Sequence, residues 1–193
     1  MYGMGVKRVS EILKVNYDRA MQCQNSFYAA FPLIKAYEKS IIRDAQKNGF
    51  ISTISSRRRY VPKINSKVGQ EQKEAERQAF STVVQGSAAD IVKLGMLKLS
   101  CAITQTSTWK TGSPPRLLMQ IHDEVLLECH VDDVFTLQHV VNDCFCLQCE
   151  NDFCLEVPLL IDCCSGRSWG NGMQDIPPSQ DFATDEEDEM AMG

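Results

Sequence analysis

The chain has 193 residues, 44% of them hydrophobic, so it is long enough for one large domain or two small ones with a buried core. It has no apolar run of about 18 residues and no basic start followed by an apolar segment, which excludes the membrane-spanning and secreted classes, so we expect an intracellular protein. The net charge of −5 is an average: residues 1–98 carry 17 Lys and Arg against 8 Asp and Glu, whereas residues 99–193 carry 3 against 17. Such an asymmetry indicates a charged partner.

The N-terminal half is predicted to be mainly helical. Hydrophobic spacing predicts helices over three ranges: 5–15, 18–30 and 33–47. A β-like segment at 50–62 surrounds Arg57-Arg58-Arg59, and a polar loop at 63–70 precedes a long helix from about 71 to 104. Gly86 lies inside this helix, where a glycine costs about 1 kcal/mol relative to alanine, so we expect a close backbone approach there.

The C-terminal half contains a predicted β-hairpin. Two short apolar runs, 116–121 and 124–129, flank the polar pair His122-Asp123, and this pattern is typical of two strands joined by a tight turn. The segments around it are predicted as a loop at 105–115, a helix at 131–150 and a strand at 155–164. A turn at 165–170 and a disordered acidic tail at 176–193 follow.

The cysteines allow two interpretations. There are nine, an odd number, and six fall between Cys144 and Cys164. Without an export signal they are expected to be reduced thiols that act as small hydrophobic residues. Cys146 and Cys149 have the spacing of zinc ligands, but no second pair completes the pattern. Structural zinc therefore stays open as the less favoured alternative.

The hairpin turn is the sharpest chemical feature, because His122, Asp123 and Glu124 are consecutive polar residues between apolar strands. At a turn such side chains can converge, and adjacent carboxylates repel unless a cation binds between them. Oxygen ligands suit Mg²⁺, but a two-metal centre needs further carboxylates from elsewhere. A solvated turn without metal is the alternative.

Two other patterns suit nucleic acid. Four polar residues follow one helix face at intervals of four: Lys73, Arg77, Ser81 and Gln85. Arg and Lys suit phosphates, whereas Gln and Ser suit sugar and minor-groove oxygens. The run Arg57-Arg58-Arg59, with Lys63 nearby, suits a phosphate backbone. An exposed helix face and a solvated turn or localisation patch are the alternatives.

These features occur within segments that, in order, resemble the C-terminal part of the A-family DNA polymerases, the family of bacterial DNA polymerase I. The resemblance covers residues 2 to about 173. The segments are Tyr2-Gly3; Gly49-Phe50 through Arg57-Arg58-Arg59-Tyr60-Val61-Pro62; Ala75-Glu76-Arg77-Gln78-Ala79; Val84-Gln85-Gly86-Ser87-Ala88-Ala89-Asp90; and Gln120-Ile121-His122-Asp123-Glu124-Val125. The Arg77 motif with Gln78, the Gln85-to-Asp90 segment and Gly166-Arg167-Ser168-Trp169-Gly170 are most similar to the animal theta and nu polymerases, which implies a nuclear location.

The resemblance implies roles in nucleotidyl transfer from a dNTP to the primer 3′-hydroxyl. Tyr2 is similar to the end of the fingers helix at the incoming nucleotide, and His122 to the residue beside the primer terminus. Asp123 is similar to the palm carboxylate that binds two Mg²⁺ ions, with Glu124 a supporting acid. DNA contacts are implied for residues in the stripe and the arginine run: Arg57, Arg58, Arg59, Lys73, Arg77, Ser81 and Gln85.

Several features of the family have no counterpart in this sequence, and two positions carry a different residue from the usual one. The first palm motif with its catalytic Asp, the triphosphate-binding Arg and Lys, and the thumb have no counterpart here. Ser81 stands where Asn is usual, and Ser56 where a Gly usually precedes the arginines. We therefore expect the last fifth or so of a longer polymerase, inactive by itself; a non-catalytic DNA-binding module from a truncated product is the alternative.

The expected fold class is α/β. An antiparallel palm sheet would carry the His-Asp-Glu hairpin and pack against helices, with helical fingers at the N-terminus. Three parts are expected: fingers at 1–63, palm at 64–175 and acidic tail at 176–193. The expected partners are primer–template DNA and dNTP, without membrane, and the chain is expected to be a monomer.

Overall fold

Helix α4, Gly69–Gln105, is the longest element, and the boundary between two units of the chain, residues 1–90 and 91–193, falls inside it. The computed structural model describes residues 5–107, 109–110, 112–170 and 172–176; Tyr2 and residues 177–193 of the expected tail lie outside them. Each unit has its own hydrophobic core. The assignment of fingers and palm to residues 1–63 and 64–175 stays a prediction.

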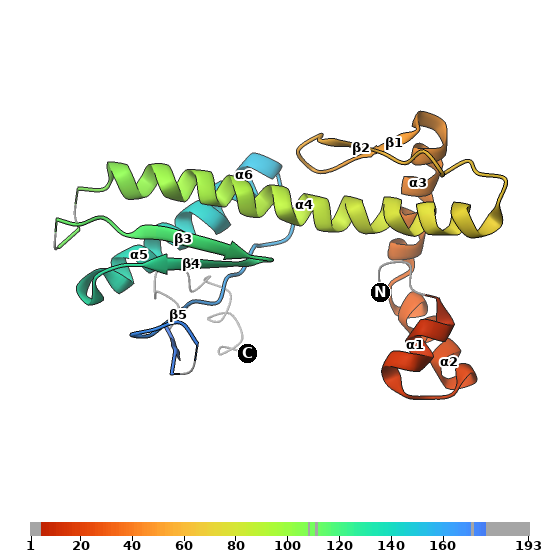
Figure 1. Cartoon of the computed structure of the whole chain (residues 1–193), viewed down its shortest axis with the longest axis horizontal. Helices are drawn as coiled ribbons and strands as arrows, with labels where there is room; N and C mark the ends of the chain where they lie inside the picture. The colour runs from red at the N-terminus through yellow and green to blue at the C-terminus, as the bar shows by residue number, and fades with distance from the viewer. Residues whose placement is uncertain (1–4, 108, 111, 171, 177–193) are drawn as a thin grey trace, which may run out of the picture. The chain divides into compact units, whose positions relative to one another are not determined.

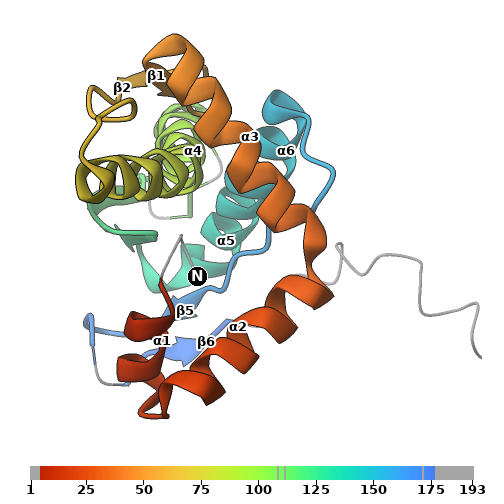
Figure 2. The ribbon, with the colours of Figure 1, turned by 90° about the vertical axis from the view of Figure 1, so that its right-hand side faces the viewer.

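Three helices open the first unit, close to the predicted ranges: α1 Val6–Leu13, α2 Tyr17–Ala30 and α3 Pro32–Asn48. The side chain of Asn16 caps α2 by accepting the backbone N–H of Arg19 at 2.9 Å. Pro32 occupies the first turn of α3, where its missing N–H costs nothing, and Gly49 ends α3 with a left-handed φ of 76°. Helices α1 and α2 lie side by side (Figure 2).

A short antiparallel hairpin follows α3, with strands β1 Phe50–Ser52 and β2 Arg58–Tyr60 (Figure 1). It packs with α3 and the first half of α4 around one core. The buried residues of this core are Ile41, Ala45, Ile51, Val61, Ile64, Ala75, Ala79, Phe80 and Val83. The turn of the hairpin contains Ser56, whose φ of 63° is in the left-handed region that favours glycine.

Gly86 does not interrupt α4, and its environment explains why the helix tolerates it. A Cβ atom at Gly86 would lie 2.8 Å from Cγ2 of Thr53, which belongs to the β1–β2 hairpin. That distance is too short for two carbon atoms, so a larger residue would push the hairpin away. The close approach predicted at this glycine is confirmed.

The second unit contains the hairpin predicted around His122. Strands β3 Arg116–Ile121 and β4 Glu124–Glu128 pair antiparallel, with Ile121 opposite Glu124, so that His122 and Asp123 form the two-residue connection. A bulge between Leu117 and Met119 shifts the register. The strands cover a core whose buried members are Leu99, Ile103, Trp109, Leu137, Cys144 and Phe145.

The segment after β4 is helical, as predicted, but in four pieces: the 3₁₀ turn η1 Val131–Asp133, α5 Val134–Asn142, the π turn η2 Asp143–Leu147 and α6 Gln148–Phe153. The ring of Phe145 in η2 packs directly on Gly95 of α4, where a Cβ would lie 2.5 Å from Cδ1 of the ring. Glycine at position 95 therefore makes room for the aromatic side chain that completes this core.

The strand predicted at 155–164 is wrong. Only Cys164–Ser165 forms a strand, β5, which pairs with β6 Gln174–Asp175. Pro158 has no N–H to donate to a ladder, and the N–H of Leu159 is bonded to the Glu150 side chain instead. In the described residues the expected single antiparallel sheet is also replaced by three separate two-stranded ribbons.

All nine cysteines are free thiols, and Cys144 and Cys149 are buried. Burial raises the pKa of the Cys144 and Cys146 thiols to about 11, so both are neutral at pH 7. In the described part of the chain no three His, Cys, Asp or Glu side chains are placed to hold a metal ion. Over the same residues, no helix combines the length and the hydropathy needed to cross a membrane.

We predict that Gly95→Ala destabilises the second unit by about 1–3 kcal/mol, because the added methyl group overpacks the ring of Phe145. Guanidinium unfolding followed by the fluorescence of buried Trp109, in a Trp169→Phe background, measures this change. Gly69→Ala in the same helix is the control, because a Cβ there meets nothing within 4 Å. Equal stability of the Gly95→Ala and control variants would contradict the packing.

We predict that Ser56→Gly stabilises the chain by about 0.5 kcal/mol, because glycine relieves the left-handed strain of about 1–2 kcal/mol but loses more backbone entropy on folding. At this chain length the midpoint of thermal unfolding should rise by about 1–2 °C. Ser56→Ala keeps a Cβ and should give no rise. A variant with alanine as stable as the one with glycine would show that position 56 is unstrained.

Candidate nucleic-acid interface

The polar stripe predicted on α4 lies on its exposed face. Lys73, Arg77 and Gln85 are exposed and Ser81 is half-buried. The core residues Ala75, Ala79 and Val83 each lie two positions from a stripe residue, which is about 200° around the helix. Burial of the apolar face against α3 and β1 therefore turns the stripe toward solvent.

The stripe residues differ in how free their polar groups are. Among the described residues, neither Lys73 nor Arg77 forms an ion pair, although acids lie nearby in the sequence. The hydroxyl of Ser81 donates to the carbonyl of Gln78 at 3.3 Å and so points along its own helix. Two cations on the stripe are thus available to an external anion, whereas Ser81 has a short reach.

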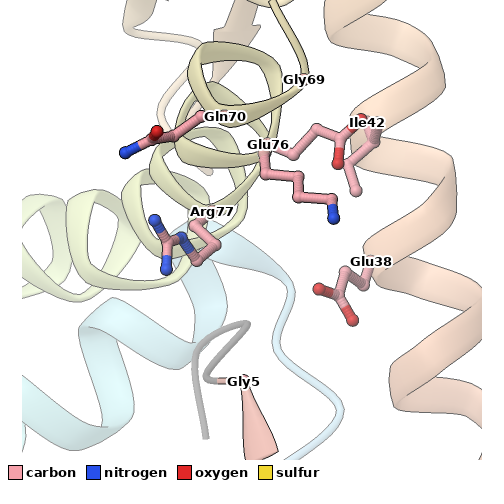
Figure 3. A pocket seen from close by; sticks show the side chains of 8 residues that line it. Gly5, Glu38, Ile42, Gly69, Gln70, Glu76 and Arg77 are labelled. Atoms are coloured by element: carbon pink, nitrogen blue, oxygen red, sulfur yellow. The ribbon is translucent and has the colours of Figure 1, made fainter. Parts of the chain in front are cut away.

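An open cavity of about 550 Å³ borders the N-terminal part of the stripe. Helix α3 contributes Glu38 and Ile42 to its lining, and α4 contributes five residues: Gly69, Gln70, Lys73, Glu76 and Arg77 (Figure 3). Gly5 completes the lining. Two acids and two bases share this cavity, so its charge is mixed rather than purely attractive to phosphate. The sequence pattern did not reveal this cavity, because its two sides come from helices separated along the chain.

The three consecutive arginines have three different environments. Arg57 donates from Nε and Nη2 to Oδ1 of Asp90, at 3.0 and 2.8 Å, and from Nη2 to the carbonyl of Gly86 at 3.2 Å. The guanidinium of Arg58 stacks on the ring of Phe50 at 4.7 Å. Arg59 donates to Oγ1 of Thr82 at 2.7 Å. A carboxylate therefore neutralises Arg57, while Arg58 and Arg59 have neutral partners.

Asp90 is the buried partner of the arginine run, and the sequence pattern did not reveal this contact because 33 residues separate it from Arg57. Its side chain is only 7% exposed, and Ser55 Oγ donates to its Oδ2 at 2.5 Å. Burial opposes the charge most strongly, but hydrogen bonds from Ser55, Thr53 and Arg57 outweigh it and hold the pKa of the Asp90 carboxyl below its usual range. The ion pair therefore stabilises the fold at neutral pH, and its contribution disappears as the pH falls through the lowered pKa.

Lys63, expected to assist the arginine run, has a different role. Its Nζ is paired with Oε1 of Glu71 at 2.9 Å, where the exposed loop after β2 meets the start of α4. This ion pair raises the pKa of Lys63 and lowers that of Glu71, chiefly through their hydrogen bond. Lys63 thus stabilises a loop instead of adding a free cation to the arginines.

In the second unit, His122, Asp123 and Glu124 are all exposed at the β3–β4 turn. His122 has a left-handed φ of 55°, a conformation that is uncommon for residues other than glycine, although Asn, Asp and His adopt it more often than the rest. Its carbonyl accepts a hydrogen bond from Nε2 of Gln120 at 2.8 Å, which fixes the turn. Backbone strain of this kind is often found at functional sites, because surrounding contacts hold it in place.

The donor set at this turn does not amount to a two-metal centre. Asp123 and Glu124 are its only carboxylates, and no third metal-binding group accompanies them in the residues that the structure describes. A centre with two ions needs several carboxylates from different segments. The stripe and the arginine run belong to the first unit and this turn belongs to the second. Tyr2 lies outside the described residues.

Comparison with known proteins places these features in a family. Residues 1–171 match the model of DNA polymerase family A. The chain is 33% identical over 175 residues to the thermostable DNA polymerase I of Thermus filiformis, covering 91% of this chain and 20% of that protein. It is 32% identical over 168 residues to DNA polymerase I of Mycobacterium bovis, covering 87% and 18%. The chain thus spans about a fifth of the length of these relatives.

A solved structure gives the same result for the fold. The POL domain of Pol1 from M. smegmatis, in a complex with DNA primer-template and dNTP, superposes with a TM-score of 0.71 and 31% sequence identity. The match covers 82% of this chain and 26% of that one. With a family model matched over residues 1–171, the chain belongs to DNA polymerase family A.

Proposed function

We propose that the chain is the DNA-binding and palm-turn portion of a DNA-directed DNA polymerase, which transfers nucleotides from dNTP to a primer 3′-hydroxyl. The observation that carries the proposal is the family match over residues 1–171, within which the stripe on α4 faces solvent. The solved relative that it resembles is a complex with DNA primer-template and dNTP, and this supports the same partners here.

In this proposal, the stripe binds primer–template DNA. Arg77 and Lys73 form no ion pair with another described residue and suit phosphates, and Gln85 carries an amide that can donate to minor-groove acceptors. Ser81 contributes less, because its short side chain is bonded to its own helix. Arg58 and Arg59 add backbone contacts from the β1–β2 hairpin. The proposed contacts of the stripe and the arginine run with DNA therefore all belong to the first unit.

The catalytic roles rest on the β3–β4 turn. Asp123 is proposed to supply one carboxylate to a two-Mg²⁺ centre, with Glu124 a supporting acid and His122 beside the primer terminus. The remaining ligands would come from polymerase segments other than this chain, because the described residues hold too few. Tyr2 is proposed to contact the incoming nucleotide. The chain by itself is thus proposed to bind DNA without polymerising it.

The finer assignment follows from sequence motifs. We assign the chain to the theta and nu group on the motif around Arg77, the Gln85-to-Asp90 segment and Gly166-Arg167-Ser168-Trp169-Gly170. From this group we infer a nuclear location and work in DNA replication or repair, including double-strand breaks. We further propose that residues 1–63 are fingers and 64–175 palm, in a chain that is monomeric.

A second candidate function is a non-catalytic DNA-binding module. It is favoured by the contrast between the stripe and the β3–β4 turn: both cations of the stripe are exposed, whereas the two carboxylates of the turn have too few further ligands within the described residues to form a two-metal centre. Both candidates predict DNA binding. They differ in whether Asp123 takes part in catalysis when the rest of a polymerase is present.

We predict that Arg77→Ala flattens the dependence of DNA affinity on salt by about one unit in log K against log salt, because the variant neutralises one phosphate fewer. Fluorescence anisotropy of a labelled primer–template at several salt concentrations measures the slope. Arg19→Ala on α2 is the control, since this exposed arginine donates to Gln22 outside the stripe. An unchanged slope with Arg77→Ala would contradict the phosphate contact.

We predict that the purified 193-residue chain, given primer–template, dNTP and Mg²⁺, shows no primer extension above an Asp123→Ala variant. The physical reason is that one turn with adjacent carboxylates supplies too few ligands for two ions. Both proteins should bind the DNA with the same affinity, as anisotropy would show. Extension by the wild-type chain but not by Asp123→Ala would overturn the prediction and make the chain a complete catalyst.

A further inference from the structure

The β1–β2 hairpin, which carries the arginine run, is hydrogen-bonded to α4 at three points along the helix. Arg59 bonds to Thr82 at 2.7 Å, the N–H of Ile54 donates to Oγ of Ser87 at 3.0 Å, and the loop before β2 bonds to Asp90. Between these levels Gly86 allows Thr53 to approach the helix backbone. The hairpin therefore lies along the part of α4 that carries Ser81 and Gln85 of the stripe.

The last of these attachments is an ion pair between the half-exposed Arg57 and the buried carboxylate of Asp90. A carboxylate that is 7% exposed is costly to bury unless hydrogen bonds and a cation compensate it. Asp90 obtains both from a single loop: Ser55 donates to one oxygen, and Arg57 donates twice to the other. Removing Arg57 leaves the carboxylate buried without its cation, so the loop conformation depends on the pair.

Nε and Nη2 of Arg57 are directed toward α4, although the side chain as a whole is 50% exposed. A guanidinium has five N–H groups, and Nε and Nη2 of Arg57 are engaged by Asp90 and by the carbonyl of Gly86. Among the described residues, Arg58 and Arg59 pair with no carboxylate, and stacking on Phe50 leaves the in-plane N–H groups of Arg58 free. Three arginines in sequence thus provide two available cations.

We propose that Arg57 and Asp90 form a clamp that positions the β1–β2 hairpin, so that Arg58 and Arg59 contact DNA phosphates while Arg57 acts on DNA only through Asp90. The proposal rests on the DNA-binding function proposed above and deepens it. Arg57 is then a positioning residue, and Asp90, an acid, promotes binding to a polyanion.

The role of Asp90 can be tested because an acid is expected to weaken binding to DNA, whereas the clamp requires it to strengthen binding. Asp90→Asn removes a negative charge, which by charge alone strengthens binding to DNA. The clamp requires the opposite result, because the amide holds Arg57 and Ser55 less well and frees the hairpin. We expect affinity for primer–template to fall by about five- to tenfold, the effect typical of removing a charged hydrogen bond, and the salt slope to flatten by about one unit for each phosphate that is no longer neutralised.

The matched control is Asp44→Asn, which removes a negative charge from an exposed position on α3 in the same unit. Its affinity should stay equal or rise slightly. Ser55→Ala is a second test that changes no charge, and it keeps the proposal falsifiable if Asp90→Asn does not fold by circular dichroism. It should weaken binding in the same direction as Asp90→Asn, and an unchanged affinity would overturn the clamp.

A double-mutant cycle separates the clamp from a direct phosphate contact. If Arg57 acts only through Asp90, then Arg57→Gln flattens the salt slope in the wild-type background and changes it no further in the Asp90→Asn background. If Arg57 binds phosphate directly, Asp90→Asn frees its charge and strengthens binding, and Arg57→Gln flattens the slope in both backgrounds. The second pattern would overturn the clamp while leaving DNA binding intact. A wild-type chain without salt-dependent DNA binding would overturn both this proposal and the proposed function.

Discussion

The architecture of the first unit depends on the close approach that small residues of α4 allow. Ala75 and Ala79 let α3 and β1 pack against the helix, and Gly86 lets Thr53 of the hairpin reach the helix backbone. Because Ala75 and Ala79 lie on the buried face, the polar stripe is left on the other. The exposure of Lys73 and Arg77 to solvent is therefore a consequence of packing on the opposite side of the same helix.

The two sites are held by opposite physical means. The hairpin of the first unit is fixed by a buried charge, since Asp90 gathers Ser55 and Arg57 on α4. The turn of the second unit is exposed, with His122 in a left-handed conformation and its carbonyl bonded to Gln120. A buried carboxylate that is paired with an arginine sets where a segment lies, whereas an exposed strained turn presents its side chains to solvent. These properties suit a binding surface and a reactive turn respectively.

Much of the secondary structure could be predicted, because helical spacing and turn residues are local signals. The three N-terminal helices, the long helix α4 and the β3–β4 pair lie close to their predicted ranges. The strand at 155–164 could not be predicted correctly, because whether a ladder forms depends on a partner strand and on Pro158, which cannot donate. The helical segment from 131 to 153 was recognised as helical, but its division around the π turn depends on how Phe145 fits over Gly95.

The amino-acid sequence was enough to identify the family motifs and the charge asymmetry, and to name the candidate site residues: the stripe, the arginine run and His122-Asp123-Glu124. Only the tertiary structure decided what each charge does. Arg57, Arg58 and Arg59 are identical residues in sequence. Asp90, 33 residues away along the chain, neutralises Arg57, whereas Arg58 and Arg59 contact uncharged partners. Likewise Lys63 is paired with Glu71, while Lys73 and Arg77 are free of ion pairs among the described residues. The physical reason is that the free energy of a charge depends on its burial and on its neighbours in space, which the order of residues along the chain does not contain.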